Sequence, residues 1–569
     1  MSPARTDAAP TRAQPRPELV SEGLPKRRER WIEVATSADH KDIGRVLIAA
    51  SLGFLLPALI ELLMMRLQLA IPENSFLEPV TFNRMLSLYG ATAIFLFALP
   101  LIIGLFQYIV PLQIGARGTA LPRLGQIGLW LYVMGATVLY LSLWFVPPEG
   151  GTTAIAPLSE SEYLPSNGID VWATTVGLCV LGFVLLSVNL LATLRNMRAP
   201  GMAWRRMPVF SWAGAIFSWL MLVLGPVMLA AVTMLLIDRN ADGTFFEGEA
   251  GSPLLWQHLT WLFFTGVVYF GTAIFAFGTL AEIIPSLSRR PLINRRVVVN
   301  SLLALAVIGT LAWVQNMLSA PIAIGWMYFG MLMALAAIVP LGLIFYNLIG
   351  TMAGGVLNMR APLLFAAGAI SVMSMGLAAE LGHTLVASAW QLSGTTDSTA
   401  ATHYALIGGA VFGGFAALHY WFPKITGRTM GEYLARASFW TLLAGVNLTF
   451  LPLFLAGVQG QVVDAYKYFS GEDVSALNLI ATIGSFVLAI GIILTLVNAV
   501  LSLKNGPRAG HDPWGGNSLE WFTVSPPPAH NFDVLPDVRS DQPLRDLRDA
   551  IARRSEREDA GAGDRRPVA

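Results

Sequence analysis

The amino-acid composition of this chain is that of a membrane protein. Of its 569 residues, 54% are hydrophobic and only 13% are charged, whereas soluble domains carry about 25% charged residues. The formal net charge of +1 excludes the strongly basic character with which proteins bind nucleic acid. The single cysteine, Cys179, excludes a disulfide framework, a cysteine-based zinc site and an iron–sulfur cluster.

The first 37 residues form a polar N-terminal segment. They are rich in proline, alanine and arginine and contain no apolar run before Trp31. We expect residues 1–37 to be a disordered cytoplasmic segment, because such a composition cannot bury enough apolar surface to fold. For the same reason we expect no cleaved signal peptide.

Apolar runs of about 20 residues, the length that crosses a bilayer as a helix, follow along the chain. The runs lie at 43–70, 85–115, 124–147, 170–196, 210–237, 255–286, 297–318, 322–350, 362–385, 400–422, 434–457 and 475–503. The sequence therefore predicts an all-α integral membrane protein with twelve transmembrane helices, forming a membrane domain over 38–504.

The basic residues between these runs predict the orientation. One set of loops carries Arg117, Arg123, Arg195, Arg198, Arg205, Arg206, Arg289, Arg290, Arg295, Arg296, Arg360, Lys424, Arg428 and Arg436. The opposite loops carry Arg84, Arg239 and Lys467. Because basic loops stay in the cytoplasm, we expect both termini there, in a bacterial-type plasma membrane.

Two segments follow the last apolar run. Residues 505–540 contain too much proline and glycine for a helix, but Trp514, Trp521 and Phe532 could pack this segment as an extended cytoplasmic strap. Residues 541–569 are charged and lack apolar periodicity, so we expect a disordered tail.

Few polar side chains in the runs could bind a cofactor. His403 could be an axial haem ligand or a helix-end histidine bonded to a loop. His383 follows Glu380 at a spacing compatible with a metal pair, but no third ligand converges in sequence, which favours a satisfied polar pair. Arg66 is more typical of a snorkelling side chain than of a cofactor contact. Tyr89 lies where interfacial aromatic residues are common.

Many short sequence motifs, in order along residues 38–540, resemble those of subunit I of the haem–copper oxidases, specifically the aa3-type cytochrome c oxidases. They include DHKDIG at 39–44, YIVPLQIGA at 108–116, NMRAPGM at 196–202, LWQHL at 255–259, EIIPSLSRRPL at 282–292, HYWFPKITGR at 419–428 and DPWG at 512–515. The resemblance implies the twelve-helix fold of that subunit.

The same resemblance locates the positions of the family's copper site. The family's His-Pro-Glu-Val-Tyr motif reads Thr265 to Tyr269 here, so only the tyrosine, which the family cross-links to the copper site, remains. The two further copper ligands correspond to Gln315 and Asn316. Because a hydroxyl and two amides are weak copper ligands, we expect no copper.

The positions implied for haem and proton transfer are also altered. The low-spin haem ligands correspond to Tyr89 and His403, and the high-spin haem ligand corresponds to Ala401. The propionate-binding arginines align near Val463 and Asp464. The ionisable residues of the proton routes correspond to Gly118, Ile344 and Val267. We expect at most one haem and no proton route through these positions.

The leading hypothesis is an oxidase subunit I-like protein that does not reduce oxygen. It would lie in the lipid bilayer as a structural or assembly partner in a respiratory complex, alongside subunit II-like or III-like proteins. One alternative is an active terminal oxidase with unrecognised ligands. Another is a single-haem or metal carrier that uses His403, with Tyr89, Met85 or His383 as a further ligand.

Overall fold

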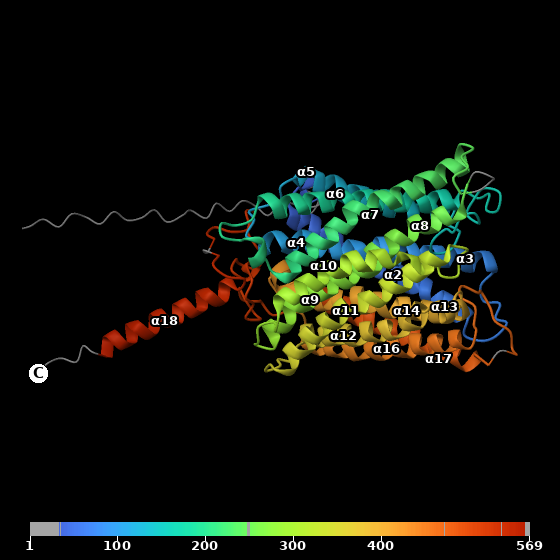
Figure 1. Ribbon diagram of the computed structural model, residues 1–569. Coiled ribbons are helices and arrows are strands. Elements are labelled where there is room, and N and C mark those ends of the chain that lie inside the picture. The colour runs from blue at the N-terminus through green and yellow to red at the C-terminus, as the bar shows by residue number, and fades with distance from the viewer. Residues whose placement is uncertain (1–32, 35, 247–250, 472, 536–537, 564–569) are drawn as a thin grey trace, which may run out of the picture. The chain divides into compact units, whose positions relative to one another are not determined.

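The computed structural model describes residues 33–34, 36–246, 251–471, 473–535 and 538–563. The chain divides into two units, Met1–Ser37 and Ala38–Ala569. Most of the first unit, which the sequence predicts to be disordered, lies outside the described residues. The second unit is a bundle of long helices that run side by side (Figure 1).

Twelve helical spans in the described part of the chain are long and apolar enough to cross a membrane, which confirms the predicted fold class. Their helices are α2 (His40–Gln68), α3–α4 (Pro79–Gln113), α5 (Pro122–Leu141), α6 (Gly168–Asn196), α7 (Val209–Asn240), α8–α9 (Pro253–Leu287), α10 (Arg295–Leu311), α11 (Ile324–Ala353), α12 (Ala361–Thr384), α14–α15 (Thr396–Thr426), α16 (Glu432–Val458) and α17 (Ser475–Asn505). The short α13 (Val386–Leu392) connects α12 to α14. The described residues contain no β-strand, only two isolated bridges.

Local sequence explains where several helices begin and end. The Asp39 carboxylate accepts a hydrogen bond from the Lys41 backbone and caps the start of α2. Proline stands at the start of α3, α5 and α8, where its missing N–H costs nothing. Gly427 ends α15 in a left-handed conformation, with φ of 77°.

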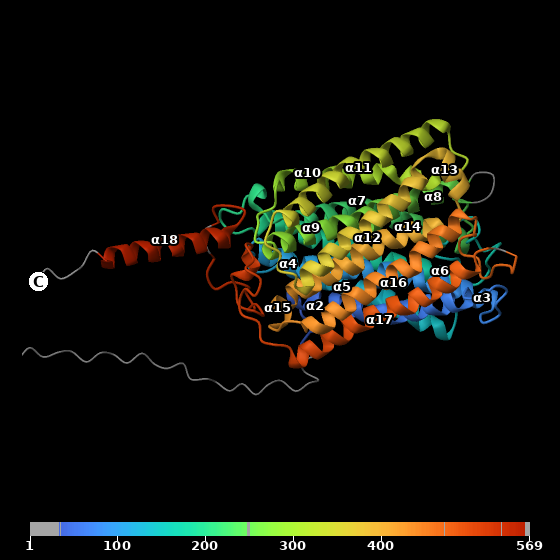
Figure 2. The same cartoon turned by 90° about the horizontal axis from the view of Figure 1, so that it is seen from below.

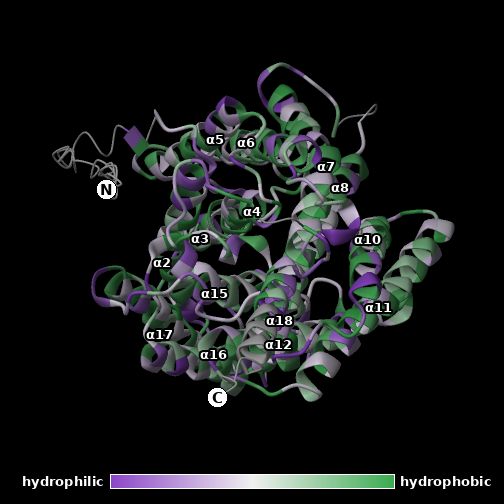
Figure 3. Ribbon diagram, turned by 90° about the vertical axis from the view of Figure 1, so that its left-hand side faces the viewer, coloured by the Kyte–Doolittle hydropathy of each residue, from purple (hydrophilic) through white to green (hydrophobic). Residues whose placement is uncertain are grey.

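Three spans form the interior of the bundle, and each changes from α- to π-helical geometry along its length. The π-helical segments are η1 (Thr92–Ala98), η4 (Phe264–Phe270) and η6 (Ile407–Phe412). In the end-on view, α4 and α15 lie inside a rim that includes α5, α7, α11 and α17 (Figure 3). Segments of π-helix are frequent at functional sites, so these three spans direct attention to the space between them.

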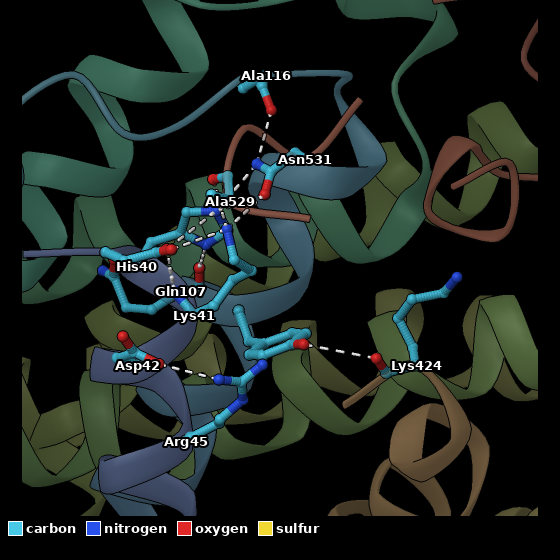
Figure 4. Close-up of polar contacts among 11 residues, drawn as sticks. His40, Lys41, Asp42, Arg45, Gln107, Ala116, Lys424, Ala529 and Asn531 are labelled. Carbon is cyan, nitrogen blue, oxygen red and sulfur yellow. Dashed lines mark hydrogen bonds and ion pairs between the residues drawn. The ribbon is translucent and has the colours of Figure 1, made fainter. Parts of the chain in front are cut away.

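The segment after α17 packs against one end of the bundle, which we call the α18 end because α18 (Pro543–Gly563) extends from it (Figures 1 and 2). Trp521 and Phe532 of this segment are each only 2% exposed. The Asn531 side chain accepts a hydrogen bond from the Lys41 ammonium at 2.9 Å and donates one to the Ala116 carbonyl at 2.8 Å (Figure 4). These bonds attach the segment to the start of α2 and the end of α4.

The charged tail differs from the expected disordered segment. Residues Pro543–Gly563 form helix α18. Leu544, Leu547 and Ile551 recur at helical spacing, and Leu544 is buried whereas Ile551 is exposed. The predicted disorder overlooked this short apolar repeat among the charges.

Candidate cofactor site

A cavity of about 520 Å³ lies between the interior spans and their neighbours. Leucine, alanine and phenylalanine side chains of α2, η1, α16 and α17 form one part of its wall. Polar side chains form the part toward the far end of the bundle, where α2 ends. These polar lining residues include Arg66, Tyr89, Tyr269, Gln315, Asn316, Glu380, His383, Thr399, Thr402, His403 and Asp464.

The three positions that the resemblance assigns to copper ligands make hydrogen bonds within the protein. The Asn316 amide donates to the Thr265 hydroxyl at 3.0 Å, and Thr265 is buried. The Gln315 amide donates to the Glu380 carboxylate at 3.0 Å. Both amides lie on η5 (Ala312–Met317), a 3-10 segment that continues α10. A hydroxyl and two amides engaged in this way do not fit copper, which prefers nitrogen donors.

Tyr269 lies next to these residues on η4 and borders the same cavity. Thr402 of α14 borders the cavity as well. His258 lies earlier on the same span and accepts a hydrogen bond from the Trp313 indole at 3.1 Å.

The two positions that correspond to low-spin haem ligands contact each other directly. The Tyr89 hydroxyl lies 2.9 Å from Nε2 of His403. Nδ1 of His403 lies 2.7 Å from the Thr399 carbonyl, which can only accept, so Nδ1 carries the proton and Nε2 accepts from Tyr89. The Phe450 ring stacks on the imidazole with ring centroids 4.8 Å apart.

This arrangement does not fit an iron held between the two side chains. A metal bound at about 2.0 Å by each donor would separate the donor atoms by about 4 Å, more than the observed 2.9 Å. The position of the high-spin haem ligand is Ala401, which is 1% exposed and has no donor atom. A haem on His403 alone would require the Tyr89 side chain to move away.

Arg66 lies inside the bundle and does not snorkel toward its surface. The side chain is 5% exposed. One terminal nitrogen donates to the Asn478 backbone carbonyl and side-chain oxygen, both at 3.1 Å, while Nε has no hydrogen-bond partner among the described residues. The expectation of a snorkelling side chain was wrong because the partner of Arg66, Asn478 of α17, lies 412 residues later in the sequence and is brought close only by helix packing.

Glu380 and His383 do not act as a pair. Nε2 of His383 lies 3.0 Å from the Asp397 carboxylate, which is fully buried. Glu380 instead accepts from Gln315. Within the described part of the chain, no group of three histidine, cysteine, aspartate or glutamate residues could hold a metal ion.

Asp397 is an acidic residue in the first turn of α14. This turn precedes the apolar run that begins at residue 400, so apolar run length does not reveal Asp397 as a partner. Asp464 emerges only from the family resemblance. Asp464 adopts a positive φ of 57°, and burial raises the pKa of its carboxyl. An acid at this place cannot bind propionates as an arginine does.

The three positions that correspond to the family's proton routes carry no ionisable group. Val267 and Ile344 are fully buried among apolar side chains. Gly118 has no side chain, and a Cβ added there would meet no atom within 4 Å. None of the three can donate or accept a proton.

Comparison with known proteins relates this fold to oxidase subunits. The family model for cytochrome C and quinol oxidase polypeptide I matches residues 42–487. The probable cytochrome c oxidase subunit 1-beta of Nocardia farcinica is 37% identical over 524 residues, covering 90% of this chain and 88% of that protein. The cytochrome c oxidase subunit 1 of Bacillus subtilis is 36% identical over 516 residues, covering 90% and 82%.

Two further matches bear on the architecture. A heme-copper oxidase subunit I+III of Aeropyrum pernix is 36% identical over 518 residues, which is 90% of this chain and 62% of that protein. A solved heme-copper terminal oxidase dimer superposes with a TM-score of 0.69 at 15% identity, covering 83% of this chain and 85% of that one. The structural match supports the fold alone.

Proposed function

Because the chain belongs to the cytochrome c and quinol oxidase polypeptide I family, we propose that it is a membrane subunit of a respiratory oxidase assembly that does not itself reduce oxygen. It would keep the packing of subunit I and act as a structural or assembly partner. Both termini would face the cytoplasm, as the basic loops indicate.

The observation that carries this proposal is the pairing of former ligand positions with each other. Asn316 bonds to Thr265, and Tyr89 bonds to His403. Each buried polar group thereby has the partner that it would otherwise need from a cofactor. Oxygen reduction needs electrons from haem or copper, because side chains alone do not carry out that chemistry.

The proton-route positions support the same conclusion. Coupling oxygen reduction to proton transfer would require ionisable groups along the routes, and Val267 and Ile344 are apolar and fully buried. The proton-route positions lack ionisable groups and the copper-ligand positions lack imidazole donors. Both changes are expected if the protein no longer carries out oxygen reduction, the one function that needs them all.

The partner class follows from the family. The Aeropyrum pernix relative is named as subunit I+III. A subunit III-like protein is accordingly a natural neighbour of this chain, and a subunit II-like protein is a second. The faces for such partners would lie among the apolar side chains exposed on the outside of the bundle, for example Trp219, Tyr346 and Trp440.

A single-haem carrier is the second candidate, because His403 borders a cavity of about 520 Å³. In that case the purified protein would show a haem absorption spectrum that is lost in His403→Ala. A colourless wild-type protein would exclude the carrier.

Oxygen uptake tests the proposed function against an active terminal oxidase. The purified protein, supplied with reduced cytochrome c or a quinol, should consume oxygen no faster than a buffer control. The Bacillus subtilis relative, assayed in parallel, serves as the positive control. Cyanide-sensitive oxygen uptake by this chain would overturn the proposal. Co-purification from its native membranes should recover oxidase subunits with it.

A further inference from the structure

The large cavity contains a buried positive charge without a matching negative one. Arg66 borders the cavity and is 5% exposed. Its guanidinium stays protonated in proteins. Among the ion pairs formed by the described residues, none involves Arg66. Buried charges in proteins are normally paired.

The protein groups around Arg66 satisfy it only in part. Asn478 and Thr482 accept hydrogen bonds from one terminal nitrogen, at 3.1 and 3.4 Å. Both acceptors are uncharged, and Nε has no partner among the described residues. The guanidinium therefore retains donor capacity and a full charge next to the cavity.

The two acidic side chains that line the cavity do not neutralise this charge. Glu380 is engaged by Gln315 and has His383 one turn away. Asp464 makes no ion pair with Arg66 in the described structure, and burial raises the pKa of its carboxyl, which favours the uncharged acid. Among the described residues no carboxylate pairs with Arg66, so an external anion can supply its counter-charge.

The rest of the cavity is suited to a hydrocarbon chain. From Arg66 the wall continues along α2 through Leu62, Leu59 and Leu55, a distance of about 16 Å at 1.5 Å per residue. Other helices complete this wall with the lining residues Ile94, Phe97, Leu406, Val411, Leu488 and Ile492. A volume of about 520 Å³ is within the range of small-molecule sites.

We propose that this cavity binds a long-chain carboxylate, with its head group paired to Arg66 and its chain lying along the apolar wall of α2, η1, η6 and α17. The inference rests on the proposed function, since it requires that no haem fills the space. A planar carboxylate matches the fork of donors on a guanidinium, and Nε supplies one donor of such a pair.

Direct binding tests the proposal. Detergent-purified protein is delipidated and titrated with oleate and with oleyl alcohol, which has the same chain without the charge. We expect oleate to bind at least tenfold more tightly than the alcohol. Arg66→Gln should weaken oleate binding at least tenfold and leave the alcohol unaffected, whereas Arg66→Lys should retain part of the preference. Equal affinity for oleate and the alcohol would overturn the proposal.

Matched control variants distinguish a loss of oleate binding from a general folding defect. Arg45→Gln removes a partly exposed arginine from the same helix, away from the cavity, and should bind oleate normally. Ala58→Leu fills the part of the cavity proposed to hold the hydrocarbon chain, so it should weaken the binding of both ligands. Gly53→Leu, at a position where an added Cβ meets nothing within 4 Å, should leave the binding of both unchanged. Undiminished oleate binding by folded Arg66→Gln and Ala58→Leu would contradict the site.

Extraction of the freshly purified protein separates failure of this inference from failure of the proposed function. Mass spectrometry should recover about one long-chain carboxylate per chain, at a reduced level from Arg66→Gln. Recovery of haem instead would overturn the proposed function. A colourless protein with no carboxylate, or with only phospholipid, would overturn this inference and leave the proposed function standing.

Discussion

At the residue scale, side-chain hydrogen bonds join the positions that the resemblance assigns to copper and haem ligands. Thr265 and Asn316 lie on different spans, and their contact satisfies a buried hydroxyl that is 3% exposed. Tyr89 and His403 make a similar contact across α3 and α14. Neutral donor–acceptor pairs need no charge compensation inside a membrane, unlike a metal with its ligands.

Substitution of Thr265 tests this structural role. Thr265→Val removes the acceptor of the Asn316 amide while conserving side-chain shape. We expect a loss of about 1 kcal/mol in the free energy of unfolding, because the partly buried Asn316 amide loses its partner. A lower thermal midpoint in detergent would report it.

Thr233→Val is the matched control, because Thr233 is exposed on α7 and bonds only to the Leu229 carbonyl. Its midpoint should be unchanged. If Thr265→Val were as stable as the control, the contact with Asn316 would not contribute to stability.

At the element scale, the segment between α17 and α18 is attached by a small number of buried groups. Asn531 contacts Lys41 and Ala116, which belong to α2 and to the segment after α4 (Figure 4). Asn531→Ala should detach this segment locally and increase its cleavage in limited proteolysis, with a loss of about 1–3 kcal/mol of stability. His530→Ala, at a neighbouring exposed side chain, should leave cleavage unchanged. Equal cleavage of the two variants would contradict this role.

A second prediction at this scale concerns pH. Glu520 is fully buried, and burial raises the pKa of its carboxyl above its ordinary value of 4.5, although hydrogen bonds from Gln113 and Trp421 oppose the shift. The folded state therefore binds a proton more tightly than the unfolded state, so stability falls as pH rises from about 4.5 through the raised pKa.

Glu520→Gln should remove this dependence. Thermal midpoints measured between pH 5 and 8 should fall for the wild-type protein relative to Glu520→Gln as pH rises. Asp533→Asn, at an exposed acid in the same segment, should follow the wild-type curve. Parallel curves for the wild-type protein and Glu520→Gln would contradict the assignment.

At the scale of the whole molecule, apolar run length was sufficient to predict the twelve spans. The ends of the helical spans lie within six residues of the predicted runs, and the largest difference is at α3, which begins at Pro79 whereas the expected run begins at 85. The partners of buried polar groups could not be predicted in this way. Arg66 bonds to Asn478, and His383 lies beside Asp397, only because helix packing brings distant segments together. The cavity is likewise bordered by three π-helical segments that apolar periodicity does not reveal.

Orientation can be measured on the intact protein because its one cysteine is buried. Cys179 has no exposed surface, so it should not react with a membrane-impermeant thiol reagent. Arg117→Cys and Glu162→Cys place exposed thiols on opposite loops. In whole cells only Glu162→Cys should be labelled, and Arg117→Cys should react after lysis. The reverse pattern would invert the predicted topology.

We propose that this family member keeps the oxidase scaffold without its redox centres. The most direct test is the haem and copper content per polypeptide, obtained from a pyridine haemochrome spectrum and metal mass spectrometry on one purified sample. We expect near-zero values for both. Two haems and one copper per chain would contradict this proposal and would mean that other residues coordinate them.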